Sequence, residues 1–201
     1  MIKSGYYETL TGPTGSPVDL ALFKSHARID FDAEDAILQT YLDTALLKVE
    51  EFSNQSMRPA QVRGNYAALD AKQFNDYPFV DLQRAPIRSV DAVRLWDGSQ
   101  FEVLTENVSY RIEQKAGYWR VVFDEFSNLG FFSLSDDQQY PVQVDFSIGP
   151  ADAANADSRL KLAVLHWAAW LYDNGGECGG EEMPSTVRKL IGSKRILRVF
   201  G

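Results

Sequence analysis

Residues 33–53 read AEDAILQTYLDTALLKVEEFS, and this stretch is the clearest helix signal in the chain. Its large apolar side chains recur at spacings of three and four residues, as on one face of an amphipathic helix: Ile37, Leu38, Tyr41, Leu42, Ala45, Leu46, Val49 and Phe52. Asp32 is expected to cap this helix, with Glu34 and Asp35 in its positively polarised first turn. We therefore predict a helix over the whole stretch.

Three further helices are predicted, one before this stretch and two near the end of the chain. Ser16 and Pro17 are residue types that cap and open helices, so a short helix should follow them to about Arg28. A third helix is expected over 158–172, and its apolar residues exceed a single stripe. Such a helix is either central to a core or buried again at a subunit contact. A short last helix is expected over 184–191.

Between residues 61 and 148 the apolar residues follow a period of two, which is typical of β-strands. The stretch 142–148 reads VQVDFSI and alternates throughout. Asp97-Gly98 is a hairpin turn signal between strands expected over 89–96 and 101–104. The sequence therefore predicts an α+β protein, in which an N-terminal helical pair and C-terminal helices form a small helical core around an antiparallel β-rich insertion.

Four parts are expected along the 201 residues: an N-terminal helical part (1–60), the β-rich insertion (61–150), a C-terminal helical part (151–192) and a C-terminal docking tail (193–201). No apolar run approaches the roughly 18 residues of a membrane span, and the first residues lack the apolar stretch of a secretory signal. The single cysteine, Cys178, excludes an internal disulfide. These features predict a protein made in a reducing cytoplasm.

The charge of the chain is uneven. The net charge is −8, which disfavours ordinary binding to the phosphates of duplex DNA. From Pro184 onward, however, there are basic residues and no acidic ones, mixed with large apolar side chains: Arg188, Lys189, Lys194, Arg195, Ile196, Leu197, Arg198, Val199 and Phe200. We expect this segment to dock on a partner or on its own body. The alternative is a solvated C-terminal helix.

The connection from Asp124 to Tyr140 is long for a loop between strands. It carries several large apolar residues among small polar ones: Phe126, Leu129, Phe131 and Phe132. Loops of this kind are uncommon and often functional, which favours a contact with another subunit or a neighbouring protein. Alternatively, these rings fold back on the sheet or form another strand.

No residue pattern indicates catalysis, a cofactor or a metal. His26 and His166 lie on separate predicted helices, and neither is followed by a second ligand at helical spacing, so both are interpreted as structural. The acids of residues 30–35 lack the glycine and the final glutamate of a calcium loop. Cys178 lies among four glycines, which offer no fixed base to activate it. Neither phosphate-binding nor nucleophile-elbow motifs occur.

Three segments, taken in order, resemble the head–tail connector (adaptor) family of tailed bacteriophages. The first is the two-helix opening over 16–52, and the second is Leu82-Gln83-Arg84-Ala85-Pro86-Ile87-Arg88-Ser89-Val90. The third is the late helix ending at Leu171-Tyr172, followed by a variable loop, Met183-Pro184 and a short basic helix. The glycine-rich joint at 175–180 and the long loop at 124–140 depart from the family pattern.

The resemblance implies a virion protein made in the host cytoplasm, whose subunits form a ring, typically twelve-fold, in the neck. Its partners would be the portal protein, copies of itself and the next neck or tail protein, with DNA only passing through the channel and no membrane contact. The basic C-terminal segment would reach the portal. Two alternatives remain at this point. One is a stopper or tail-completion protein of the same neck, and the other is a small β-rich enzyme or ligand-binding module.

Overall fold

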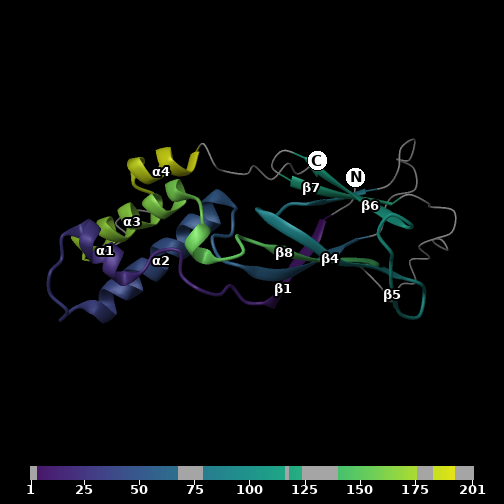
Figure 1. Cartoon of the computed structure of the whole chain (residues 1–201), viewed down its shortest axis with the longest axis horizontal. Helices are drawn as coiled ribbons and strands as arrows, with labels where there is room; N and C mark the ends of the chain where they lie inside the picture. Colours follow the sequence, from purple (N-terminus) through teal and green to yellow (C-terminus); the bar gives the residue numbers. More distant parts are fainter. Residues whose placement is uncertain (1–3, 68–78, 116–117, 124–139, 176–182, 193–201) are drawn as a thin grey trace. The chain divides into compact units, whose positions relative to one another are not determined.

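The computed structural model describes residues 4–67, 79–115, 118–123, 140–175 and 183–192. The chain folds into two compact units (Figure 1). The helical unit takes in Thr14–Pro59 and the described residues from Gly149 onward, and the β unit takes in Ala60–Ile148 and the described residues before Thr14. The predicted α+β class is confirmed, since helices and antiparallel sheets are both present.

In the helical unit, the described residues form α1 (Leu20–Ala27), α2 (Asp35–Ser53), a 3-10 turn (Ala153–Asn155), α3 (Ser158–Asp173) and α4 (Ser185–Gly192). Helix α3 packs against the other three α-helices. Of the apolar residues beyond its inner face, Leu165 is buried within the unit, whereas Leu162 is 38% exposed. Helix α3 is central to the core of the helical unit. None of the helices in the described ranges is long and apolar enough to cross a membrane.

The first two helices begin later than the sequence predicts. Asp19, rather than Ser16, caps α1, because its carboxylate accepts a hydrogen bond from the backbone N–H of Leu22 at 2.7 Å. Helix α2 begins at Asp35 without a side-chain cap. The predicted cap, Asp32, instead accepts a hydrogen bond from Lys24 on α1. Lys24 also donates to Asp35, the first residue of α2, so Lys24 links the two helices.

The buried stripe of α2 is narrower than predicted. Leu38, Leu42 and Val49 are fully buried, whereas Ile37 and Phe52 are 44% and 40% exposed. A helix turns by about 100° per residue, so Ile37 points well away from its buried neighbour Leu38. Sequence periodicity therefore identified the helix but wrongly assigned Ile37 to its buried face. Phe52 lies at the edge of that face, where its ring packs against Trp167.

The β unit contains two antiparallel sheets, which Figure 1 shows as two layers. The first has the order β1-β2-β8-β4-β5 and the second β3-β7-β6. The strands are β1 (Ser4–Thr11), β2 (Ala60–Tyr66), β3 (Phe79–Leu82), β4 (Ile87–Trp96), β5 (Phe101–Val103), β6 (Tyr110–Lys115), β7 (Tyr118–Phe123) and β8 (Val142–Ile148). Their inward side chains form one core, with Phe146 of the first sheet and Phe123 of the second fully buried.

Strand β1 corrects the expected division of the chain. Residues 1–60 were assigned to the helical part, but Ser4–Thr11 pair antiparallel with β2 and belong to the β unit. The ring of Tyr7 explains the pairing, because it packs edge-on against the buried rings of Tyr66 and Phe146. The sequence SGYYETLT is too polar to show the apolar alternation that predicts a strand.

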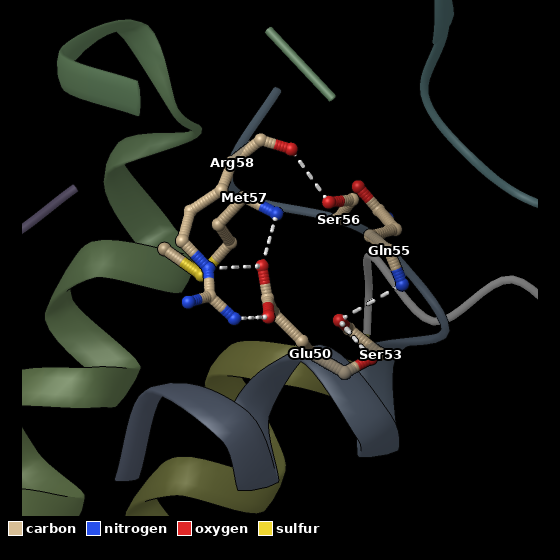
Figure 2. A network of polar contacts seen from close by, with 6 residues as sticks. All are labelled: Glu50, Ser53, Gln55, Ser56, Met57 and Arg58. Carbon is tan, nitrogen blue, oxygen red and sulfur yellow. Dashed lines mark hydrogen bonds and ion pairs between the residues drawn. The ribbon is translucent and has the colours of Figure 1, made fainter. Parts of the chain in front are cut away.

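A hydrogen-bonded cluster holds the turn from α2 into β2 (Figure 2). The carboxylate of Glu50 accepts hydrogen bonds from the backbone N–H of Met57 at 2.8 Å and from Nη2 of Arg58 at 2.7 Å. The side chains of Glu50 and Arg58 are only 15% and 16% exposed, so water screens this ion pair weakly. Ser56 Oγ donates to the carbonyl of Arg58 at 2.7 Å and closes the turn.

Two other chain segments meet this turn within the helical unit. The backbone N–H of Thr14 donates to the carbonyl of Pro59 at 3.1 Å. Gly149, which follows β8, has a φ of +79°, and a Cβ at this position would lie 2.1 Å from the carbonyl oxygen of Arg58. Only glycine permits both the left-handed backbone and the close approach. The three places where the described chain enters or leaves the helical unit are therefore tied to one another.

We predict that Glu50→Gln lowers the free energy of unfolding by about 2 kcal/mol, because Arg58 loses its charged partner in a poorly hydrated site. Chemical denaturation at neutral pH measures the change. The control is Glu51→Gln, since Glu51 is 71% exposed and lies 3.6 Å from Lys48. The control should change stability by less than about 0.5 kcal/mol. Equal stability of the two variants would show that the cluster does not hold the turn.

Candidate interaction surfaces

Helix α4 presents a basic face. Val187 and Ile191 are buried in the core of the helical unit, whereas Arg188 and Lys189 are exposed. The helix STVRKLIG contains no acidic residue, so its solvent side is positively charged. The structure thus places two of the predicted docking residues at the surface. The remaining ones lie outside the described residues: Lys194, Arg195, Ile196, Leu197, Arg198, Val199 and Phe200.

The four apolar residues of the predicted contact loop also lie outside the described residues: Phe126, Leu129, Phe131 and Phe132. The first described residue after them is Tyr140, whose ring packs edge-on against Tyr6 of β1 with centroids 5.2 Å apart. Tyr6 itself is 53% exposed. The chain therefore enters β8 beside an exposed aromatic residue, and the role of the loop stays a prediction.

The helical unit exposes several large apolar side chains that periodicity alone did not identify as surface residues: Leu22, Phe31, Ile37, Leu47 and Phe52. Ile37 and Leu47 lie ten residues apart, or about 2.8 helical turns, so their directions around the axis of α2 differ by about 80° and both point away from its buried stripe. Thr40, between them on that side, is also exposed. Exposed apolar side chains gathered on one helix face are typical of protein contact surfaces.

The outer face of the five-stranded sheet carries a buried carboxylate between two arginines. Asp145 of β8 accepts hydrogen bonds from Nε of Arg63 at 2.6 Å and from Nη1 of Arg94 at 2.6 Å. Its side chain is 7% exposed. Burial by itself raises the pKa of Asp145, but the hydrogen bonds from the two guanidinium groups outweigh burial and hold this pKa below its ordinary value of 3.8.

A second carboxylate on the same face links further strands through two neutral donors. Asp91 of β4 accepts hydrogen bonds from Gln61 of β2 at 2.9 Å and from Ser147 of β8 at 2.8 Å. The alternation of 142–148 predicted that one side of β8 is polar. It could not reveal which residues of other strands meet that side, because the partners come from positions 51 to 82 residues away.

The two histidines meet in the helical unit. The rings of His26 on α1 and His166 on α3 have centroids 5.1 Å apart and are nearly perpendicular. Partial burial and the neighbouring His166 lower the pKa of His26. Within the ranges that the structure describes, no three or more histidine, cysteine, aspartate or glutamate side chains gather as metal ligands would. Cys178 lies outside those ranges.

We predict that Asp145→Asn lowers the free energy of unfolding at pH 7 by about 3 kcal/mol, because two partly buried arginines lose their shared anion. The folded-state pKa of Asp145 is depressed, so its contribution is present above pH 3.8 and is lost as the pH falls through the folded pKa. The difference from the wild-type chain should therefore shrink on acidification. Asp43→Asn is the exposed control. A penalty that does not change with pH would contradict the assignment.

Comparison with known proteins finds a similar family. Residues 17–115 match the family model described as phage gp6-like head–tail connector protein. This match confirms the resemblance of the sequence motifs and takes in the elements from α1 to β6. No curated protein matches the chain.

Solved structures resemble the chain over 98% of its length and over 98% of their own. A chain in the virion of a native gene transfer agent (GTA) particle is 26% identical, with a TM-score of 0.68. Chains in the neck of an empty GTA particle, computed with C6 symmetry, and in the neck of a native GTA particle, computed with C12 symmetry, are 21% and 22% identical, with TM-scores of 0.69 and 0.68. Over residues 17–115, the chain is therefore similar to the phage gp6-like head–tail connector family.

Proposed function

We propose that this chain is a head–tail connector (adaptor) subunit, located in the neck of a phage-like particle between the DNA-filled head and the tail. The observation that carries the proposal is the family match over residues 17–115, together with a fold shared over nearly the whole chain with a protein of the GTA virion. The description of the family favours a connector over a stopper or tail-completion protein. The proposed role is binding without catalysis.

The subunits form a ring in this proposal. Two of the similar structures are necks computed with six-fold and twelve-fold symmetry, which supports a repeated subunit. A closed ring needs two different surfaces on each subunit, one for each neighbour. The exposed side of α2, with Ile37 and Leu47, offers one such surface. The outer sheet face offers another of different chemistry.

In this proposal, the basic C-terminal segment binds the portal protein. Arg188 and Lys189 are exposed at the end of the helical unit, and the chain continues into Lys194–Phe200 with further basic and apolar residues. One such segment from each subunit of a ring adds many weak contacts into a stable attachment. The opposite side of the ring binds the next neck protein. A net charge of −8 suits a channel through which DNA passes, since few phosphates are neutralised.

We predict that deleting residues 193–201 abolishes binding to the portal and leaves the fold intact. The deletion removes Lys194, Arg195 and Arg198 with their apolar neighbours, but no buried residue of the described core. Pull-down with purified portal measures binding, and circular dichroism checks the fold. Lys48→Gln, which removes an exposed positive charge from α2, is the control and should bind normally. Undiminished portal binding by the truncated chain would refute the tail-anchor assignment.

We also predict that replacing Phe131 and Phe132 together by Ser weakens the contact with a neighbouring subunit or neck protein. Both changes remove large apolar surface from a connection of unusual length. Thermal melting of the isolated chain and sedimentation of assembled necks measure stability and assembly separately. A melting temperature lowered by more than about 5 °C would instead assign these rings to the core of the β unit.

A further inference from the structure

One corner of the outer sheet face combines unused hydrogen-bond donors with exposed apolar surface. We call the corner patch five residues on three strands: Asn65, Arg94, Trp96, Phe101 and Val103. Asn65 and Gln143 are register partners on β2 and β8. Arg94 of β4 is the register partner of both Gln143 and Val103, and Trp96 is that of Phe101. Because Val93 and Leu95 point into the core, Arg94 and Trp96 point outward on the same face.

Two donors of the corner patch have no acceptor. Nδ2 of Asn65 and Nε1 of Trp96 are buried, and neither has a hydrogen-bond partner in the described part of the chain. Asn65 is 3% exposed, and its Oδ1 already accepts a hydrogen bond from Gln143 at 3.1 Å. Buried donors without acceptors are rare in folded proteins, so each calls for an explanation. One explanation is an acceptor supplied by another molecule, which reaches these covered donors when the side chains of Asn65 and Trp96 move on binding.

Arg94 adds a charged donor. Its Nη1 binds Asp145 at 2.6 Å, and the side chain remains 24% exposed. Asp145 is shared with Arg63, so one carboxylate serves two guanidinium groups. Arg63 has a second acid nearby, because Glu8 of β1 is its register partner. Arg94, on β4, lies farther from Glu8 than Arg63 does. The corner patch therefore favours a partner that carries a carboxylate.

Apolar surface borders these donors. Val103 is 62% exposed on the short edge strand β5. The rings of Trp96 and Phe101 pack edge-on with centroids 5.2 Å apart. A complementary partner thus places a carboxylate against Arg94 and an apolar side chain against Val103. Aromatic residues next to hydrogen-bonding groups are typical of contact centres between proteins.

The chain itself exposes a segment of this chemistry. Asp30-Phe31-Asp32 connects α1 to α2, with Phe31 42% exposed and the Asp32 side chain 89% exposed. Asp30 is exposed, and no hydrogen bond or ion pair of its carboxylate is found among the described residues. We propose that the corner patch binds the Asp30-Phe31-Asp32 segment of a second copy of this chain. The inference rests on the proposed ring, in which each subunit uses two different surfaces.

A peptide titration tests the surface without requiring a ring. A synthetic peptide of residues 27–36 is added to the full-length, isotope-labelled chain, and the Trp96 indole and Asn65 amide resonances are followed by NMR. We expect both resonances to shift, and the same peptide with Asp30→Asn to bind about tenfold more weakly, as for the loss of one charged hydrogen bond. Absence of shifts at saturating peptide, or equal affinity of both peptides, overturns the inference.

Disulfide trapping tests the contact between copies. In a Cys178→Ser background, Phe31→Cys and Val103→Cys chains are mixed under conditions in which rings are seen by electron microscopy. The mixture should form disulfide-linked pairs, and each variant alone should not. Val108→Cys, which is 69% exposed in the wild-type chain and outside the corner patch, replaces Val103→Cys in the control mixture.

The outcomes separate the two proposals. Rings without Phe31–Val103 linkage, or equal linkage with the Val108→Cys control, overturn the corner-patch contact and leave the proposed connector role untouched. If no ring forms with or without portal, the proposed function fails, and the peptide titration alone decides whether the patch recognises the segment. Trp96→Phe keeps an aromatic side chain but removes the indole N–H. This variant should bind the peptide more weakly and remain folded.

Discussion

The structure depends on how one chain serves two separate apolar cores. The described chain passes between the helical unit and the β unit after Pro13, after Pro59 and after Ile148. Each unit must therefore fix the chain where it enters or leaves that unit. The Glu50–Arg58 ion pair does this in the turn after α2. The carbonyl of Arg58 then excludes any side chain at Gly149. This turn connects α2 of the helical core to β2, which pairs with β8. Its loss would therefore disturb both the helical core and the pairing of β2 with β8.

Local patterns predicted most elements because their causes are local. The alternation of VQVDFSI gave the bounds of β8, and Asp97-Gly98 marked the hairpin between β4 and β5. The predictions were wrong where a contact with another segment determines the structure. Strand β1 depends on β2 and on the packing of Tyr7, and Asp32 binds Lys24 instead of capping a helix. Exposure of Ile37 likewise depends on which helices surround α2, which no single segment reveals.

Some of the candidate surfaces could be predicted from the sequence, and others could not. Composition alone identified the basic segment, and the structure shows Arg188 and Lys189 exposed on α4. The corner patch was beyond prediction, because its residues lie on separate strands and its unused donors become visible only when the sheet is assembled. The family match over residues 17–115 supports the proposed role in the neck. We propose that several chemically different contact faces on one small subunit perform this role.

In the proposed role, the surfaces of this chain bind the portal and one another. Cryo-electron microscopy of purified portal mixed with an excess of the chain tests it most directly. We expect a ring of density from this chain on one face of the portal, with the helical unit repeated around the channel axis. Portal particles that carry no added density at saturating concentrations of the chain would contradict it.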